Sequence, residues 1–267
     1  MLETELVGDE TDIKVACCNF YEHDFIKLLL GDSLHPGGLE LTEQLGKKLL
    51  LKPKDKILDL ASGLGVSAIF LAEKFGSTIT GIDVSEKNVD QANITAQKKG
   101  LKNVTFEVAD AEHLPYEAEE FDVVISECSF CLFPNKTIAT QEMWRVLKPN
   151  GRLGLTDVAI EKELPFDAQN ILLRVVCIAD ALSMSEYRLT FENSGFKIEL
   201  LEDKKEYVLQ MISSVKKKIF LAELAKGVKK IDLKNLDLKL AKYWIKQGRR
   251  LVNEGYGTYM MLIGKKI

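Results

Sequence analysis

The stretch "LDLASGLGVSAIFLAEKFG" (58–76) decides the fold. A short apolar run contains an acid near its end, small residues and two glycines follow, and then a helix-like segment begins. In an open parallel sheet, ligands bind outside the carboxyl ends of the strands. The stretch therefore predicts a strand, a loop that cradles an adenosine-containing ligand, and the helix that follows this loop.

Outward from this stretch, strand-like and helix-like segments alternate. The expected strands are 56–60, 78–83, 103–110, 121–127 and 152–158, and the expected helices between them are 67–75, 86–100 and 136–148. This alternation predicts βαβ units and a parallel sheet. The strands are almost continuously apolar, as strands covered by helices on both faces are. Helices at 169–183 and 185–195 and strands at 196–202 and 257–267 are expected to complete the fold.

The two ends of the chain differ from this core, although we expect one domain over residues 1–267. Residues 1–50 predict a helical N-terminal cap that is interrupted at "HPGG" (35–38) and resumes near Leu41. Residues 204–253 hold 14 Lys+Arg and 4 Asp+Glu, and their apolar residues recur at helical spacing. We expect a basic helical insertion over 204–255 whose apolar side packs on the domain or on a second subunit in a homodimer. That side would comprise Leu221, Leu224, Leu236, Leu238 and Trp244.

Composition limits the cellular setting. No stretch of about 18 apolar residues lacks charges, so no membrane partner or transmembrane span is expected. The acidic start "MLETELVGDETD" does not resemble a secretory signal, which favours a cytoplasmic location. Five cysteines, an odd number, predict free thiols rather than a disulfide framework.

Acidic residues mark the ends of the first three expected strands. Asp59 and the loop at 61–65 follow the first strand, and Gly63 and Gly65 would let the backbone approach a ligand closely. Asp83 would accept hydrogen bonds from ribose hydroxyls, and Asp110 would accept one from an adenine amino group. The loop lacks the third glycine of G-x-G-x-x-G, so a dinucleotide is the less favoured ligand.

Four segments in order resemble class I S-adenosylmethionine (SAM) methyltransferases over roughly residues 35–200: "ILDLASGLGVSAIFLA", "GID", "VADAEHLPYEAEEFDVVIS" and "MWRVLKPNGRLGLTDV". The resemblance implies SAM as cofactor and a Rossmann-like, seven-stranded α/β sheet with helices on both faces and an antiparallel last strand. Ala61 stands where the family usually has glycine, and its methyl group is tolerable if its φ is negative. The implied cofactor-binding residues are Asp59, Ala61, Ser62, Gly63, Gly65, Asp83, Val84, Asp110, Ala111 and Ser126.

Two further segments, "ECSFCLFPNK" (127–136) and "LLRVVCIADALSMSEYRLTFENSGF" (172–196), resemble arsenite methyltransferases. Cys128 and Cys177 match the two cysteines of that family in these segments, which implies that they are the catalytic thiols that hold arsenite. Trivalent arsenic prefers thiolates, and its lone pair would take the methyl group without a general base. Cys17 and Cys18 do not match the family's remaining motif, so a third thiolate is not identified.

Several alternatives stay open. Cys128, Cys131 and Cys177 are equally well explained as small core residues, and structural zinc at Cys17-Cys18 with Cys128-x-x-Cys131 would require unfavourable spacing. His35 is weighed as a site residue against a structural role. The small-molecule acceptor could instead be a carbon, oxygen or nitrogen nucleophile of a metabolite, or the chain could bind SAM without catalysis. A nucleic-acid partner is disfavoured by the net charge of −4 and by "SECS" (126–129) in place of an "NPPY"-type tetrapeptide.

Overall fold

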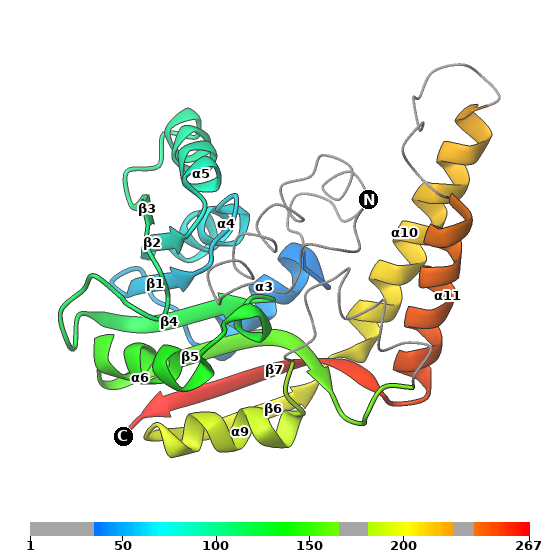
Figure 1. Cartoon of the computed structure of the whole chain (residues 1–267). Helices are drawn as coiled ribbons and strands as arrows, with labels where there is room; N and C mark the ends of the chain where they lie inside the picture. Colours follow the sequence, from blue (N-terminus) through cyan, green and yellow to red (C-terminus); the bar gives the residue numbers. More distant parts are fainter. Residues whose placement is uncertain (1–34, 166–180, 227–237) are drawn as a thin grey trace.

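A computed structural model describes residues 35–165, 181–226 and 238–267 (Figure 1). The helices expected before residue 35, and most of the one expected at 169–183, lie outside these residues. At the centre is a seven-stranded sheet with the order β3-β2-β1-β4-β5-β7-β6. Its strands are β1 (Lys56–Leu60), β2 (Thr78–Asp83), β3 (Val104–Val108), β4 (Phe121–Glu127), β5 (Leu147–Ile160), β6 (Phe196–Asp203) and β7 (Gly257–Lys266).

Strands β1 to β5 are parallel, and β7 is antiparallel to both of its neighbours, β5 and β6. The register aligns the carboxyl ends of the central strands, since Leu60 of β1 pairs with Ser126 of β4, and Glu127 of β4 pairs with Thr156 of β5. Side chains that follow β1, β2, β4 and β5 are therefore placed along one edge. The predicted Rossmann-like sheet with its antiparallel last strand is confirmed.

Helices cover both faces of the sheet. They are α3 (Gly38–Lys48), α4 (Val66–Phe75), α5 (Glu86–Lys98), α6 (Lys136–Val146) and α9 (Met184–Asn193), with the short 3₁₀-helix η1 (Phe130–Leu132) after β4. Successive strand residues point to opposite faces: Ile57 packs with α3, α4 and α5, whereas Leu58 packs with α6 and α9. Both residues are fully buried, so the central strands are enclosed on two sides.

The boundary between α6 and β5 differs from the expected one. The sequence predicted a helix to residue 148 and a strand from 152, but the helix ends at Val146 and the strand begins at Leu147. Leu147 is fully buried and pairs with Phe121 of β4, so sheet pairing overrides helix continuation here. Pro149 also disfavours the helical conformation at the residue before it.

Two helices, α10 (Lys205–Lys226) and α11 (Leu238–Asn253), lie between β6 and β7 in the chain, as the expected insertion requires. They run side by side and extend away from the sheet (Figure 1), and Arg249 of α11 donates a hydrogen bond to Ser213 of α10 at 3.0 Å. Leu221 does not pack on the domain, because its side chain is 52% exposed, so a second subunit is the one of the two expected surfaces left for it. Ile219, on the opposite side of α10, is buried instead. Among the described helices, none combines the length and apolarity that crossing a bilayer requires.

Candidate active site

The glycine loop after β1 is fixed to the end of β2 by backbone hydrogen bonds. The N–H of Ser62 donates to the carbonyl of Ile82 at 2.8 Å, and the N–H of Gly63 donates to the Asp83 carboxylate at 2.8 Å. The other Asp83 oxygen accepts from the N–H of Ser85 at 2.9 Å. Asp83 therefore joins the glycine loop to the start of α5, and both expected ligand-binding features lie at one edge of the sheet.

Ala61 has a φ of +52°, so the condition under which its methyl group would be tolerated without strain, a negative φ, is not met. The chain enters the left-handed region where it turns out of β1 into the loop. For a residue with a Cβ, this conformation costs about 1–2 kcal/mol. The backbone geometry thus explains why glycine is usual here, and Ala61 retains the turn at a cost in strain.

The two glycines of the loop serve different needs. Both have positive φ, +55° at Gly63 and +73° at Gly65. A Cβ built on Gly63 would meet nothing within 4 Å, whereas one on Gly65 would collide with the ring of Phe106 and lie 3.0 Å from Ala92. Of the two glycines, only Gly63 therefore borders open space, whereas the missing side chain of Gly65 lets the start of α4 pack against Phe106 and Ala92.

Two buried polar atoms of the edge have no hydrogen-bond partner: Oδ2 of Asp59 and Oγ of Ser62. The pKa of Asp59 is raised well above its usual range, first by burial and then by the carboxylates of Glu127 and Asp83. Buried polar groups are rarely left unpaired. Unpaired acceptors beside the open face of Gly63 are typical of a site that a polar ligand completes.

The other expected cofactor residues lie around this point. Val84, directly after β2, is an apolar side chain with 43% exposure, and Ala111 is buried. Asp110, beyond β3, accepts a hydrogen bond from the N–H of Glu112 at 3.0 Å. Ser126 is fully buried, and its hydroxyl contacts that of Ser129 at 2.6 Å. The sheet brings Asp59, Asp83 and Ser126 onto three adjacent strands, with Val84, Asp110 and Ala111 at the β2–β3 side.

A buried polar network that the sequence analysis missed joins α3, α4 and β4. The hydroxyl of Thr42 lies 2.9 and 3.2 Å from the two carboxylate oxygens of Glu127, and 3.4 Å from the hydroxyl of Ser67. His35 Nε2 lies 3.4 Å from Ser67 Oγ and 3.8 Å from Glu127 Oε2. Glu127 is a fourth acid at a strand end, after Asp59, Asp83 and Asp110, and that repetition was the signal available in the sequence.

The candidate acceptor thiol, Cys128, follows β4 directly. It is half-buried, its φ is +57°, and its N–H donates to the carbonyl of Thr156 at 2.6 Å. Burial, and next the carboxylate of Asp157, raise the pKa of the thiol. Left-handed conformations of residues other than glycine concentrate at functional sites. Cys177, the expected partner thiol, lies outside the described residues, as do Cys17 and Cys18.

Cys131 and Asp157 form a buried pair beside Cys128. The N–H groups of Cys131 and Val158 each donate to the Asp157 carboxylate at 2.7 Å. Burial raises the pKa of Asp157 to about 6, and these donors partly oppose the rise. Cys131 is buried, and burial followed by the Asp157 charge raises the pKa of its thiol. Among the described residues, no group of three or more His, Cys, Asp or Glu side chains is arranged to hold a metal ion.

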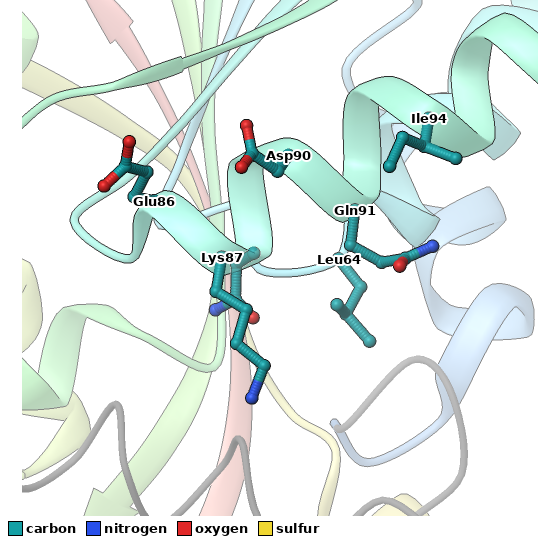
Figure 2. A pocket seen from close by; sticks show the side chains of 7 residues that line it. Leu64, Glu86, Lys87, Asp90, Gln91 and Ile94 are labelled. Carbon is teal, nitrogen blue, oxygen red and sulfur yellow. The ribbon is translucent and has the colours of Figure 1, made fainter.

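A hollow of about 440 Å³ lies against α5 and the loop residue Leu64 (Figure 2). Its lining residues are Leu64, Glu86, Lys87, Asn88, Asp90, Gln91 and Ile94. In Figure 2, Lys87 and Leu64 point to one side of α5, and Glu86 and Asp90 point to the other. None of Asp59, Glu127 and Cys128 lines this hollow, so we place the candidate site at the carboxyl edge instead.

Comparison with known proteins identifies the family. A methyltransferase domain family matches residues 51–211. The chain is 29% identical to 27-O-demethylrifamycin SV methyltransferase of Amycolatopsis mediterranei over 259 residues, covering 91% of this chain and 93% of the relative. It is 32% identical to methyltransferase GfsG of Streptomyces halstedii over 66% of this chain and 64% of the relative, thus over somewhat less than two thirds of that protein's length.

Two further matches are more distant in sequence or cover less of the matched protein. An arsenite methyltransferase of Halobacterium salinarum is 29% identical over 58% of this chain and 41% of the relative. The structure of phosphoethanolamine N-methyltransferase 2 from Haemonchus contortus superposes with a TM-score of 0.81 at 18% identity, covering 97% of this chain and 60% of that one. The sheet order, the glycine loop and these matches agree. The chain belongs to the class I SAM-dependent methyltransferases, and SAM is its cofactor.

Proposed function

We propose that the enzyme transfers the methyl group of SAM to a trivalent metalloid such as arsenite, held by thiolates that include Cys128 and Cys177. The observation that supports this most is the placement of Cys128 at the carboxyl end of β4, in a left-handed conformation beside the glycine-loop edge. The similarity to an arsenite methyltransferase over 159 residues is consistent with it.

The residues of the edge fit SAM. Three carboxylates lie close together here, those of Asp59, Asp83 and Glu127. After burial, the charges of Glu127 and Asp83 are the next causes of the raised pKa of Asp59. In the described part of the chain, no lysine or arginine pairs with Asp59 or Glu127. A sulfonium cofactor carries positive charge into such a site, whereas a dinucleotide pyrophosphate would be repelled.

Within this proposal, each strand end has a part in binding. Asp83 accepts the ribose hydroxyls, Val84 and Ala111 contact the adenine ring, and Asp110 accepts from its amino group. Gly63 leaves room for the cofactor because no side chain occupies the space above it. When bound, SAM supplies an electrophilic methyl group, which the metalloid lone pair takes as the bond to sulfur breaks.

Binding of the metalloid acceptor depends on the ionisation of the cysteine thiols. Thiolates bind soft centres, but burial and Asp157 keep the Cys128 thiol protonated. Metalloid binding must therefore release protons and weaken as the pH falls. No proton leaves the metalloid itself, so the transfer needs no general base.

Cysteine variants test this function. Cys128→Ser should abolish arsenite-dependent methyl transfer from labelled SAM, while the Kd for SAM, measured by calorimetry, changes less than twofold. Cys131→Ser is the matched control and should retain transfer, because Cys131 is buried against Asp157 rather than half-exposed. Retained transfer in the Cys128 variant would refute the assignment of this thiol.

A second candidate is methyl transfer to a hydroxyl group of a metabolite. The alignment with the rifamycin methyltransferase supports it, since this alignment covers 91% of the chain. Such an acceptor carries a proton, and Asp157, with a pKa near 6 beside the acceptor loop, is the candidate base. This chemistry predicts loss of transfer in Asp157→Asn with Cys128→Ser still active, the reverse of the metalloid pattern.

The setting of the enzyme is also part of the proposal. We propose a cytoplasmic enzyme that acts on small molecules rather than nucleic acid and forms a homodimer through α10. Phe220 and Leu221 support the dimer, because both side chains are more than half exposed on this helix. Sedimentation velocity would test the dimer, and a monomer at all concentrations would contradict it.

A further inference from the structure

The acceptor loop, residues 128–135, connects β4 to α6 and carries Cys128 at its start. This start is fixed to the neighbouring strand, because the N–H of Cys128 donates to the carbonyl of Thr156 at 2.6 Å. The middle of the loop is the 3₁₀-helix η1 (Phe130–Leu132). A 3₁₀ turn has poor hydrogen-bond geometry of its own, so groups outside the loop decide how firmly Cys128 is held.

A buried carboxylate holds the middle of the acceptor loop from the side of the sheet. Asp157 of β5 is fully buried, and it accepts the N–H of Cys131 and that of Val158, each at 2.7 Å. Hydrogen bonds to an ionised group are stronger than those between neutral groups. Cys131 is thereby held inside the protein, with 2% exposure, although it follows the half-buried Cys128 by only three positions.

A cation holds the same turn from its other end. Lys136 is the first residue of α6, and its ammonium group donates to the carbonyls of Cys131 at 3.2 Å and of Phe133 at 3.1 Å. These carbonyls lie within η1 and directly after it, where the end of a helical turn leaves C=O groups to be satisfied by other donors. Lysine side chains satisfy such groups, and their charge interacts favourably with the carbonyl dipoles. Lys136 therefore closes the end of the acceptor loop.

Cys131 is thus placed between two opposite charges. The carboxylate of Asp157 binds its N–H, and the ammonium of Lys136 binds its carbonyl. Burial raises the pKa of Asp157, and the charge of Lys136 is among the causes that oppose this rise, so the two charges act on each other across the turn. Loss of the ammonium would leave two carbonyls without this donor and the buried carboxylate without this cation. Because unpaired buried groups are costly, the turn would open more often.

We infer that Lys136 is a positioning residue for the methyl acceptor. Together with Asp157, it holds the acceptor loop in the conformation in which Cys131 stays buried and Cys128 presents its thiol at the carboxyl edge. A metalloid held by two thiolates requires their sulfurs at fixed positions, and a loop that is already ordered loses little entropy when the metalloid binds. This inference rests on the proposed metalloid function, but the order of the loop can be measured without any acceptor.

Alkylation by iodoacetamide, read for each cysteine by peptide mass spectrometry, measures the order of the loop. Lys136→Met keeps the aliphatic stem and removes the donor. We expect its Cys131 to react about tenfold faster than in wild type, the factor for losing one hydrogen bond to a charged group. Lys136→Arg restores a cationic donor and should react at close to the wild-type rate. Lys148→Met is the matched control, because its ammonium pairs with Asp122 at 2.8 Å at the opposite end of β4, and it should leave Cys131 protected.

The acceptor provides the second readout. Lys136→Met should raise the KM for arsenite about tenfold with an unchanged kcat, because acceptor binding is weakened equally before and in the transition state. Its Kd for S-adenosylhomocysteine should stay as in wild type, since the glycine loop is untouched. If Lys136→Met does not fold, as its thermal melt would show, Lys136→Gln makes the same test with a shorter, neutral donor.

Two results would overturn the inference: Cys131 is alkylated no faster in Lys136→Met than in wild type, or it is alkylated faster while the KM for arsenite is unchanged. A wild type without arsenite-dependent transfer would instead refute the proposed function. The alkylation rates would still decide in that case whether Lys136 orders the acceptor loop.

Discussion

Replacing Ala61 with glycine should stabilise the protein. Ala61 has a φ of +52°, and an alanine there carries about 1–2 kcal/mol of strain that glycine does not. Glycine also makes the unfolded chain more flexible, which costs about 0.4–1 kcal/mol. The difference predicts a net gain of about 0.5–1 kcal/mol in the free energy of unfolding of Ala61→Gly.

Urea denaturation followed by circular dichroism measures this gain as a higher midpoint at an unchanged slope. Ala68→Gly is the matched control, because the same substitution is made at a buried position inside α4. It should destabilise by about 1 kcal/mol or more. Destabilisation by Ala61→Gly would refute the left-handed turn at the start of the loop.

Four further predictions concern the glycine loop with Asp83, the buried Asp157 and the helical insertion. Asp83→Ala should weaken SAM binding by roughly 1.5–3 kcal/mol in calorimetry, and an unchanged Kd would contradict the placement of the ribose at Asp83. Gly65→Ala should lower the thermal midpoint because its Cβ would collide with Phe106, and an unchanged midpoint would contradict that packing. The folded pKa of Asp157 lies above its unfolded value, so its contribution to stability is present below about pH 4 and lost as the pH rises through 6, about 3 kcal/mol in total. Between pH 4 and 6, the free energy of unfolding measured by urea denaturation should therefore fall less with rising pH in Asp157→Asn than in the wild type. Leu221→Glu should convert the proposed dimer to a monomer in sedimentation velocity without unfolding it, and a persistent dimer would place the interface elsewhere.

Where local sequence determines structure, the predictions agree with the fold. The strands 56–60, 78–83 and 121–127 have the predicted bounds, because each is a short, mostly buried segment that is followed directly by loop residues. Where contacts between residues distant in the sequence determine the structure, the predictions differ from the fold. Leu147 joins β5 because it pairs with Phe121, and that pairing is not visible in the helix-like segment 136–148.

The candidate site follows the same division. Asp59, Asp83 and Gly63 could be placed from the motif, because strand ends and glycine loops have regular geometry. The network of Glu127 with Thr42 could not, since the two residues are 85 positions apart and meet only when α3 packs beside β4. The positive φ of Ala61 could not be predicted either, because alanine ordinarily avoids the left-handed region.

The most direct test of the proposed function is methyl transfer by the purified full chain. The protein would be incubated with methyl-labelled SAM and a thiol reductant, with and without arsenite, and the products separated by chromatography. We predict label in a methylated arsenical, with an equal amount of S-adenosylhomocysteine, only when arsenite is present. SAM binding without any arsenite-dependent label transfer would contradict the metalloid acceptor.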